Sequence, residues 1–447
     1  MSERVESGGL RRSLSVRDLM VYGLLFIAPM APVGVFGVLD AKSHGAVAAV
    51  YLVATVAMGF TAFSYAQMVR AVPQTGSVFA YARAGLGEGP GFIAGWMAML
   101  DYLLIPAVAY LFSGIALNSL VPDVSRWVWT ALAVVVTTAL NLAGVRTAAV
   151  VGFAVLAMEI AVLAVFVVAA VVVLVRDGAQ RGWATPFTAV GDFSAAAVLS
   201  AVSVAVLSYL GFDAIATFVE EAVGASAAVA RAVLWCLVVS GVLFVTQTYL
   251  AALLEPLAPQ QLAADPAAQG SAFYDTVESG VGHWLHVLVA ASKAIGAAFA
   301  ALAGQAAAAR LVYAMGRGGR LPRFLGVVDP KTAVPRRALL VAAAITLAAA
   351  VWAAGRDDGL DRLTSVVDVG ALTAFALLHA SVVGWYAVKH HSRDWLRHVV
   401  VPVLGVVVIG AVVFEASGTA QVVGLVWLAV GFMVLVVQGA SGAGIRR

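Results

Sequence analysis

The sequence has 447 residues, of which 62% are hydrophobic and 11% charged, and its mean hydropathy is +0.97. Soluble domains carry about 45–50% apolar and about 25% charged residues, so the composition excludes an ordinary soluble protein and indicates an integral membrane protein. The single cysteine, Cys236, excludes a disulfide framework. The formal net charge of +3 is too small to indicate a nucleic-acid partner.

Twelve apolar segments are long enough to cross a lipid bilayer, which takes roughly 20 apolar residues in a helix. They fall near residues 18–40, 46–69, 91–118, 127–143, 149–175, 196–221, 231–254, 284–314, 336–354, 363–387, 397–414 and 419–439. An even number of spans puts both termini on the same side of the membrane. Residues 1–17 carry no signal-peptide cleavage site, and we expect them and residues 440–447 to be cytoplasmic tails.

Basic residues are distributed unevenly between the two sides. Twenty of the 27 lysines and arginines fall in segments on the N-terminal side, and six fall on the other side. Because cytoplasmic loops of membrane proteins are enriched in Lys and Arg, we predict cytoplasmic termini and a location in the plasma membrane. The longest outer loop, 255–283, contains acidic residues but no Lys or Arg, and is predicted to be either a lid or a tether.

Two of the spans are interrupted. The first, at residues 26–37, contains Pro29, Pro32 and two glycines, and the second, at residues 208–215, contains Gly211 and Asp213. A break at mid-depth of a bilayer survives only beside a cavity or buried in protein, and a matched pair of breaks is typical of a transporter's substrate site. The alternative role of such glycines is close helix packing.

The breaks fall in the first and sixth spans and therefore predict a repeat. Residues 18–175 and 196–387 form two five-helix units, and the odd number of spans inverts the second unit relative to the first. Residues 397–439 supply two peripheral helices. The predicted fold is thus an all-α polytopic membrane protein with twelve transmembrane helices, in which helices one and six are discontinuous.

Several motifs resemble a known family. Residues 209–221, YLGFDAIATFVEE, resemble the sixth-span motif of the amino acid–polyamine–organocation permeases, and residues 310–322 resemble the loop after their eighth span. Residues 100–106, 141–145 and 370–375 are similar to the putrescine-importer branch. The resemblance implies a LeuT-type fold, alternating access and import driven by an ion gradient, commonly of protons, with no metal or other cofactor.

The broken helices predict how a substrate is bound. In span one, the amides that start the outer half suit a carboxylate, and the carbonyls that end the inner half suit an ammonium group. Span six repeats this arrangement around its own break, so the site fits a zwitterionic amino acid. The candidate substrate-binding residues are Ala28, Met30, Val33, Gly34, Val35, Phe36, Gly37, Tyr102, Tyr209, Gly211, Phe212 and Asp213.

Four of the polar residues have specific candidate roles. Asp213 either holds the substrate amine or caps the inner half-helix. Tyr102 corresponds by resemblance to a tyrosine implicated in substrate recognition among putrescine importers, and its alternative role is aromatic packing. Glu220 and Glu221 either serve a cytoplasmic gate or mark the end of the helix.

Two charged residues lie inside spans. A charged side chain inside a bilayer costs free energy, so such residues are candidates for a functional role. Glu159 is central in span five, where some proton-coupled permeases, by resemblance, place a lysine. Because burial disfavours the charged form of a carboxylate, Glu159 is predicted to load and release a proton; its alternative is a protonated acid bonded to a neighbouring helix. Lys293 in span eight either snorkels outward, pairs with an acid such as Glu159, or meets an anionic substrate group.

The first break departs from the resemblance. Putrescine importers carry an aspartate where this chain has Gly34, and Lys293 adds a positive charge where that branch is neutral. The sequence therefore predicts a proton-coupled importer of a neutral or acidic amino acid, with a polyamine importer or an amino acid/amine exchanger as the alternative. A channel would need a continuous polar lining, and an enzyme would need clustered histidines, cysteines or paired acids; neither is evident.

Overall fold

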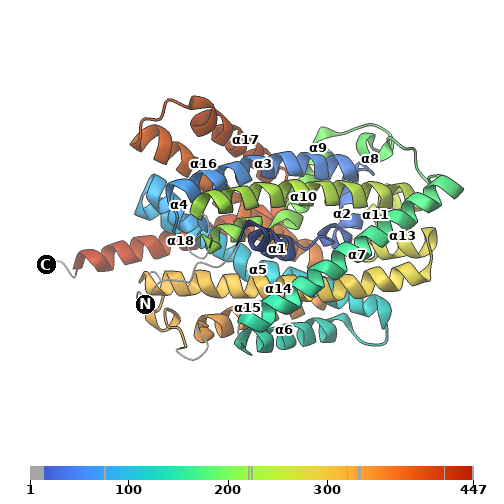
Figure 1. Ribbon diagram of the computed structural model, residues 1–447, viewed down its shortest axis with the longest axis horizontal. Helices are drawn as coiled ribbons and strands as arrows, with labels where there is room; N and C mark the ends of the chain where they lie inside the picture. Colours follow the sequence, from blue (N-terminus) through green and yellow to red (C-terminus); the bar gives the residue numbers. More distant parts are fainter. Residues whose placement is uncertain are drawn as a thin grey trace, which may run out of the picture.

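The computed structural model describes residues 15–444 apart from residues 75–76, 144, 220–221, 223–224, 320, 330–333 and 417. The long helices α3, α10 and α14 run along the longest axis of the molecule, and α7 crosses obliquely in front of α14 (Figure 1). The helices of ten residues or more are α1 (Val16–Ile27), α3 (Val47–Ala71), α4 (Ser77–Leu86), α5 (Glu88–Leu120), α6 (Arg126–Ala143), α7 (Val145–Asp177), α9 (Ala195–Ala205), α10 (Ala225–Leu254), α14 (His283–Arg317), α15 (Arg336–Ala354), α16 (Gly359–Val382), α17 (Val401–Phe414) and α18 (Gly418–Gly444).

The first membrane segment consists of separate helical pieces, as the sequence predicts. A capping box starts α1: the Ser15 hydroxyl accepts from the Asp18 amide at 3.3 Å, and the Asp18 carboxylate accepts from the Ser15 amide at 2.8 Å. The helix ends at Ala28, whose φ is +59°. A 3₁₀ turn, η1 (Ala31–Gly34), and a short helix, α2 (Phe36–Lys42), complete the segment.

The second predicted break is also present. Helix α9 continues into the 3₁₀ turn η2 (Val206–Tyr209), and a second 3₁₀ segment, η3 (Phe212–Phe218), follows the break. Gly211 has φ +118°, a conformation that glycine adopts without the steric penalty of a side chain. The chain therefore changes direction at Gly211, which is the only glycine within residues 206–218.

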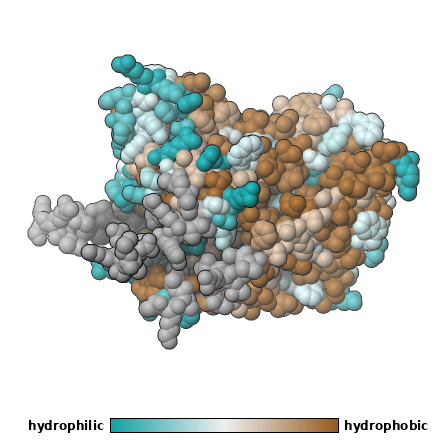
Figure 2. All heavy atoms as spheres, viewed as in Figure 1, coloured by the Kyte–Doolittle hydropathy of each residue, from teal (hydrophilic) through white to brown (hydrophobic). Residues whose placement is uncertain are grey.

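Ten helices of the described chain are long and apolar enough to cross a membrane. Two shorter apolar helices, Arg126–Leu142 and Ala195–Tyr209, coincide with the predicted fourth and sixth spans. The hydrophobic residues cover most of the visible face, and the hydrophilic ones gather toward its two ends (Figure 2). The chain is therefore a multi-pass membrane protein.

Helix α5 is central to the packing of the bundle. It contacts α14 and α16 on two sides, while α3 pairs with α10. Helices α17 and α18 are the least buried of the membrane-length helices, which agrees with their predicted peripheral position. Two π-helical segments, η5 (Val383–Lys389) and η6 (Leu396–Val400), extend α16 and lead into α17.

The long loop over residues 255–283 is folded against α2, the second half of the broken first segment. It forms α11 (Pro259–Ala264), α12 (Pro266–Gln269) and α13 (Ala272–Gly280), and all three contact α2. The ring of Phe273 packs edge-on against Phe36, with centroids 5.6 Å apart. The loop is therefore packed on the first segment, and its role as a lid stays a prediction.

A buried ion pair holds segments together in the same region. Both guanidinium NH₂ groups of Arg181 donate to the carboxylate of Asp40, at 2.7 and 2.8 Å, and one of them also donates to the Leu257 carbonyl at 2.5 Å. The side chains of Asp40 and Arg181 are 0% and 8% exposed. The pair joins the end of α2 to the loops that carry Arg181 and Leu257.

We expect Asp40→Asn to destabilise the protein strongly, because it leaves the Arg181 guanidinium buried without its counter-charge. Removing one partner of a buried pair costs about 3–5 kcal/mol, measurable as a lower unfolding midpoint of the detergent-solubilised protein. Asp177→Asn is the matched control, since Asp177 pairs with Arg176 on the exposed surface. Equal, small effects of both substitutions on the unfolding midpoint would contradict a stabilising role for the buried ion pair.

Candidate substrate site

A small cavity lies between the two breaks. Its volume is about 50 Å³, enough for roughly three to five water molecules at about 10–15 Å³ each. It is lined by Phe26, Ile27, Ala28, Ala31, Ile105, Val108, Ala109, Phe112, Leu207, Ser208, Leu210, Lys293, Ala297 and Ala300. The cavity is too small for an amino acid and has to widen before it admits one.

Side chains from two other helices satisfy the carbonyls that the first break releases. The Gln247 amide of α10 donates to the Pro29 carbonyl at 2.9 Å, and the Lys293 ammonium of α14 donates to the Met30 carbonyl at 3.0 Å. In a bilayer no water is available for this task. The break therefore persists because α10 and α14 supply its hydrogen bonds.

Lys293 is directed into the protein and lines the cavity. Its side chain is 2% exposed, and its ammonium lies 5.0 Å from the centre of the Phe112 ring, within the range of a cation–π interaction. It does not snorkel outward, which removes one of the three alternatives. The Phe112 ring also covers Gly34, where an added Cβ would lie 2.6 Å from the ring.

Glu159 of α7 is fully buried, and neither of its carboxylate oxygens has a hydrogen-bond partner within the described chain. The carboxylate packs on Gly296, where a Cβ would overlap with Oε1. Gly296 lies one turn from Lys293 on α14, and Glu159 and Lys293 interact electrostatically. The structure thus brings together the two charged residues that the sequence singled out.

Asp213 forms a hydrogen-bonded cluster directly after the second break. Its Oδ2 accepts from the Tyr102 hydroxyl at 2.6 Å and from the Tyr65 hydroxyl at 3.5 Å, and its Oδ1 accepts from the Gly211 amide at 3.2 Å. The bond to Gly211 runs from the carboxylate back to the amide of the residue that precedes η3, so it holds the chain at the break. Tyr102 and Asp213, predicted from separate spans, therefore meet in space.

Other predicted residues form the walls of the breaks instead of the cavity. The Tyr209 hydroxyl bonds to the Thr55 hydroxyl at 2.6 Å, facing α3, and the Phe212 ring packs against Tyr65. Val33, Val35, Phe36 and Gly37 are buried and do not line the cavity. Glu220 and Glu221, the candidate gate residues, lie outside the described residues.

Sequence reasoning missed most of the apolar lining. Ile105, Ala109 and Phe112 follow Tyr102 along α5 at intervals of three or four residues, which puts all four on one helical face. This spacing could have identified the α5 contribution. Phe26 lies at the start of the predicted first break, but it was not among the candidate substrate-binding residues.

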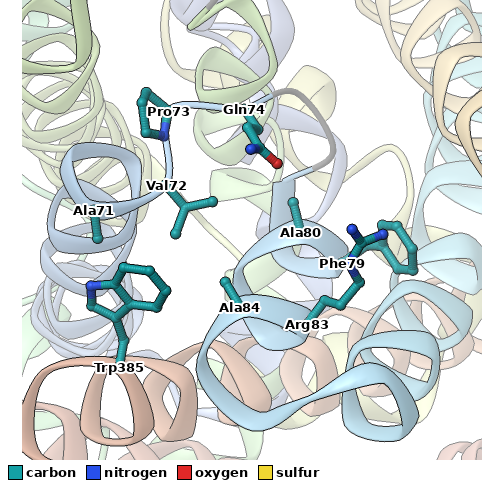
Figure 3. Close-up of a pocket in the computed structure, with 9 residues that line it drawn as sticks. All are labelled: Ala71, Val72, Pro73, Gln74, Phe79, Ala80, Arg83, Ala84 and Trp385. Atoms are coloured by element: carbon teal, nitrogen blue, oxygen red, sulfur yellow. The ribbon is translucent and has the colours of Figure 1, made fainter. Parts of the chain in front are cut away.

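A larger pocket of about 340 Å³ lies elsewhere, between the C-terminal end of α3, helix α4 and the π-helical segment η5. Figure 3 shows Gln74, Arg83 and Trp385 around it. None of its lining residues belongs to either break. Its position is therefore separate from the cavity between the broken helices.

The multi-pass helical bundle with two broken helices around a cavity defines a membrane permease. Residues 19–440 match the model of the amino acid permease family, and the chain belongs to that family. It is a transporter and not an enzyme, and the resemblance to amino acid–polyamine–organocation permeases is confirmed.

Three relatives cover nearly the whole chain. The low-affinity putrescine importer PlaP of Escherichia coli is 28% identical over 97% of this chain and 94% of its own length. The branched-chain amino acid permease BcaP of Bacillus subtilis is 25% identical over 95% and 92%. The methylthioribose transporter of Bacillus subtilis is 25% identical over 97% and 95%.

We expect Gly211→Ala to damage the second break. Alanine in this left-handed conformation costs about 1–3 kcal/mol, and its Cβ would overlap with the Phe26 ring. The unfolding midpoint in detergent should fall and substrate uptake should be lost. Gly59→Ala is the control, because this helical glycine of α3 has its nearest neighbour, Leu237, at 3.9 Å. If Gly211→Ala behaved like Gly59→Ala, the break would not depend on glycine.

Proposed function

We propose that the protein imports an amino acid across the plasma membrane by alternating access, driven by protons. The observation that carries this proposal is the buried pair of Glu159 and Lys293, whose ammonium holds a carbonyl of the broken first segment. The alternative function is import of a polyamine, or exchange of an amino acid for an amine.

The substrate would bind between the two breaks. Its carboxylate would lie near the Lys293 ammonium and the amides that start the outer half of segment one, because both are positive. Its α-amino group would lie toward the carbonyl end of α1 and toward Asp213 with Tyr102. In this orientation each charged end of the substrate faces protein groups of the opposite charge or dipole.

Coupling would arise from charge balance in a medium of low dielectric constant. A proton on Glu159 leaves the Lys293 ammonium without a compensating charge, and uncompensated buried charge is expensive. A substrate carboxylate supplies the missing negative charge. Proton and substrate therefore favour each other's binding, and such a coupling free energy is reciprocal. A diamine has no carboxylate and gains nothing from this mechanism.

The topology belongs to the same proposal. Residues 18–175 and 196–387 would be two inverted five-helix units, residues 397–439 two peripheral helices, and both termini would be cytoplasmic. Glu220 and Glu221 would serve the cytoplasmic gate. The ten membrane-length helices and the two shorter apolar ones support twelve spans.

A polyamine substrate is the second candidate, and one observation favours it. Two buried acids, Asp101 and Asp213, lie within electrostatic reach of each other, as the recognition of an amine requires. The name of the relative from Escherichia coli points the same way. The ammonium of Lys293 beside the cavity opposes a dicationic substrate.

We expect Glu159→Gln to abolish the response of uptake to a proton gradient, because glutamine cannot carry the coupling proton. The measurement is uptake of a labelled amino acid and polyamine panel into proteoliposomes, with and without an inward proton gradient. Wild-type uptake of an amino acid should rise with the gradient, and Glu159→Gln uptake should not.

Glu415→Gln serves as the control, since Glu415 lies at the end of α17, outside the site. Gradient-dependent uptake that persists unchanged in Glu159→Gln would contradict the role of Glu159. Stronger uptake of putrescine than of any amino acid would replace the proposed substrate with the alternative.

A further inference from the structure

The larger pocket beside α4 lies where two membrane-length helices end. Its wall includes Ala71, the last residue of the span Val47–Ala71, and Trp385, near the end of the span Arg362–Lys389. These spans have 25 and 28 residues, more than the roughly 20 that cross the hydrocarbon core of a bilayer, so their ends reach the depth of the lipid headgroups. The volume of about 340 Å³ falls in the range of about 300–1,000 Å³ that is typical of ligand pockets.

Close contact between α4 and η5 fixes one side of this pocket. A Cβ on Gly384 would lie 2.6 Å from the carbonyl oxygen of Gly85, so the two backbones touch directly. The Lys389 ammonium donates to the carbonyl of Ala84, a lining residue, at 2.5 Å. The pocket is therefore formed before any ligand binds.

The π-helical segment η5 carries the aromatic wall of the pocket. Segments of this type are rare and are frequent at functional sites. The Trp385 ring packs against the ring of His390, with centroids 4.5 Å apart, and the hydroxyl of the next residue, Tyr386, donates to the Gln67 carbonyl of α3 at 3.2 Å. These contacts hold the indole ring in place at the pocket wall.

Two polar side chains supply hydrogen-bond donors. Gln74 and Trp385 lie on opposite sides of the pocket, and Arg83 projects from α4 beside Phe79 (Figure 3). The Arg83 guanidinium carbon lies 6.0 Å from the centre of the Phe79 ring. Its Nε pairs with Glu88 at 3.3 Å, but the two side chains are 51% and 65% exposed, and an exposed pair contributes little free energy. The guanidinium can therefore bind an anion at small cost.

The surroundings of the pocket are positively charged. Residues 67–90 and 383–400 contain two acidic residues, Glu88 and Asp394, and five basic ones: Arg70, Arg83, Lys389, Arg393 and Arg397. The second range also exposes Val388, Trp395 and Leu396, each by 65% or more. Basic residues beside exposed tryptophan and aliphatic side chains are typical of a membrane–water interface. The charge and the depth of the pocket thus both suit an anionic lipid.

We propose that this pocket binds the headgroup of an anionic phospholipid. The phosphate accepts from the Arg83 guanidinium, whose two parallel donors match a phosphate group, and the rest of the headgroup lies between the Gln74 amide and the Trp385 ring. The bound headgroup links α3, α4 and η5, and stabilises the folded protein because it binds this arrangement only. The inference is independent of the substrate, since the pocket is separate from the cavity between the broken helices.

The test is a calorimetric titration of the detergent-solubilised full-length protein. Short-chain phosphatidylglycerol is compared with phosphatidylcholine that has the same acyl chains. We expect wild type to bind phosphatidylglycerol roughly tenfold more tightly or better, as a hydrogen bond to a charged group implies, and to show a higher unfolding midpoint with it. Arg83→Gln should remove most of this preference, because the phosphate loses its charged donor. Equal binding of the two lipids by wild type would overturn the inference.

Arg393→Gln is the matched control, because it removes the same charge from an exposed residue that does not line the pocket. This variant should keep the preference for phosphatidylglycerol. An equal loss in Arg393→Gln and Arg83→Gln would show that the lipid responds to surface charge in general, and would overturn the pocket as its site.

A second variant tests the pocket without changing any charge. Ala80→Trp places a large side chain at a lining position of α4, and should abolish the tight binding of phosphatidylglycerol while the variant still unfolds cooperatively. Binding that persists in this variant would place the lipid elsewhere. Titration with inorganic phosphate separates the two sources of a phosphate group. If wild type bound inorganic phosphate as tightly as phosphatidylglycerol, and Arg83→Gln lost both, the ligand would be a soluble anion and the lipid would be wrong.

Discussion

The hydrogen bond from Lys293 to the Met30 carbonyl is the interaction on which the site depends. A broken helix inside a bilayer exposes backbone groups that water cannot reach, and this contact satisfies one of them with a charged donor. It also fixes the ammonium beside the cavity and ties α14 to the first segment. In the proposed mechanism, a change in the charge balance of Lys293 would act on the backbone that holds the substrate.

Near the hydrogen bond between Lys293 and Met30, two side chains lie directly on the backbone of glycine residues. The Phe112 ring lies over Gly34, and the Glu159 carboxylate lies over Gly296 on the helix that carries Lys293. Both arrangements leave no room for a side chain at the glycine. The cavity is consequently narrow and apolar, with its charged groups at defined positions, and electrostatic interactions in such a medium are stronger than in water.

The sequence predicted the parts of this structure that obey local rules. Prolines and glycines located both breaks, and hydropathy located the membrane helices. The sequence could not decide between the alternatives for Lys293, because the direction of this side chain depends on packing between α14 and the first segment. Phe112 shares a helical face with Tyr102 and could have been identified by its spacing, but its contact with the Lys293 ammonium depends on packing between α5 and α14. The meeting of Tyr102 with Asp213 likewise required three-dimensional structure.

The most direct test of proton coupling through Glu159 is the number of protons that enter with each substrate molecule. Proteoliposomes holding a pH-sensitive dye, with no gradient imposed, would receive the amino acid that the uptake panel identifies. Coupling through Glu159 predicts that the lumen acidifies by about one proton per imported molecule in wild type, and that Glu159→Gln gives no acidification. Import by wild type without acidification, or equal acidification by Glu159→Gln, would contradict it.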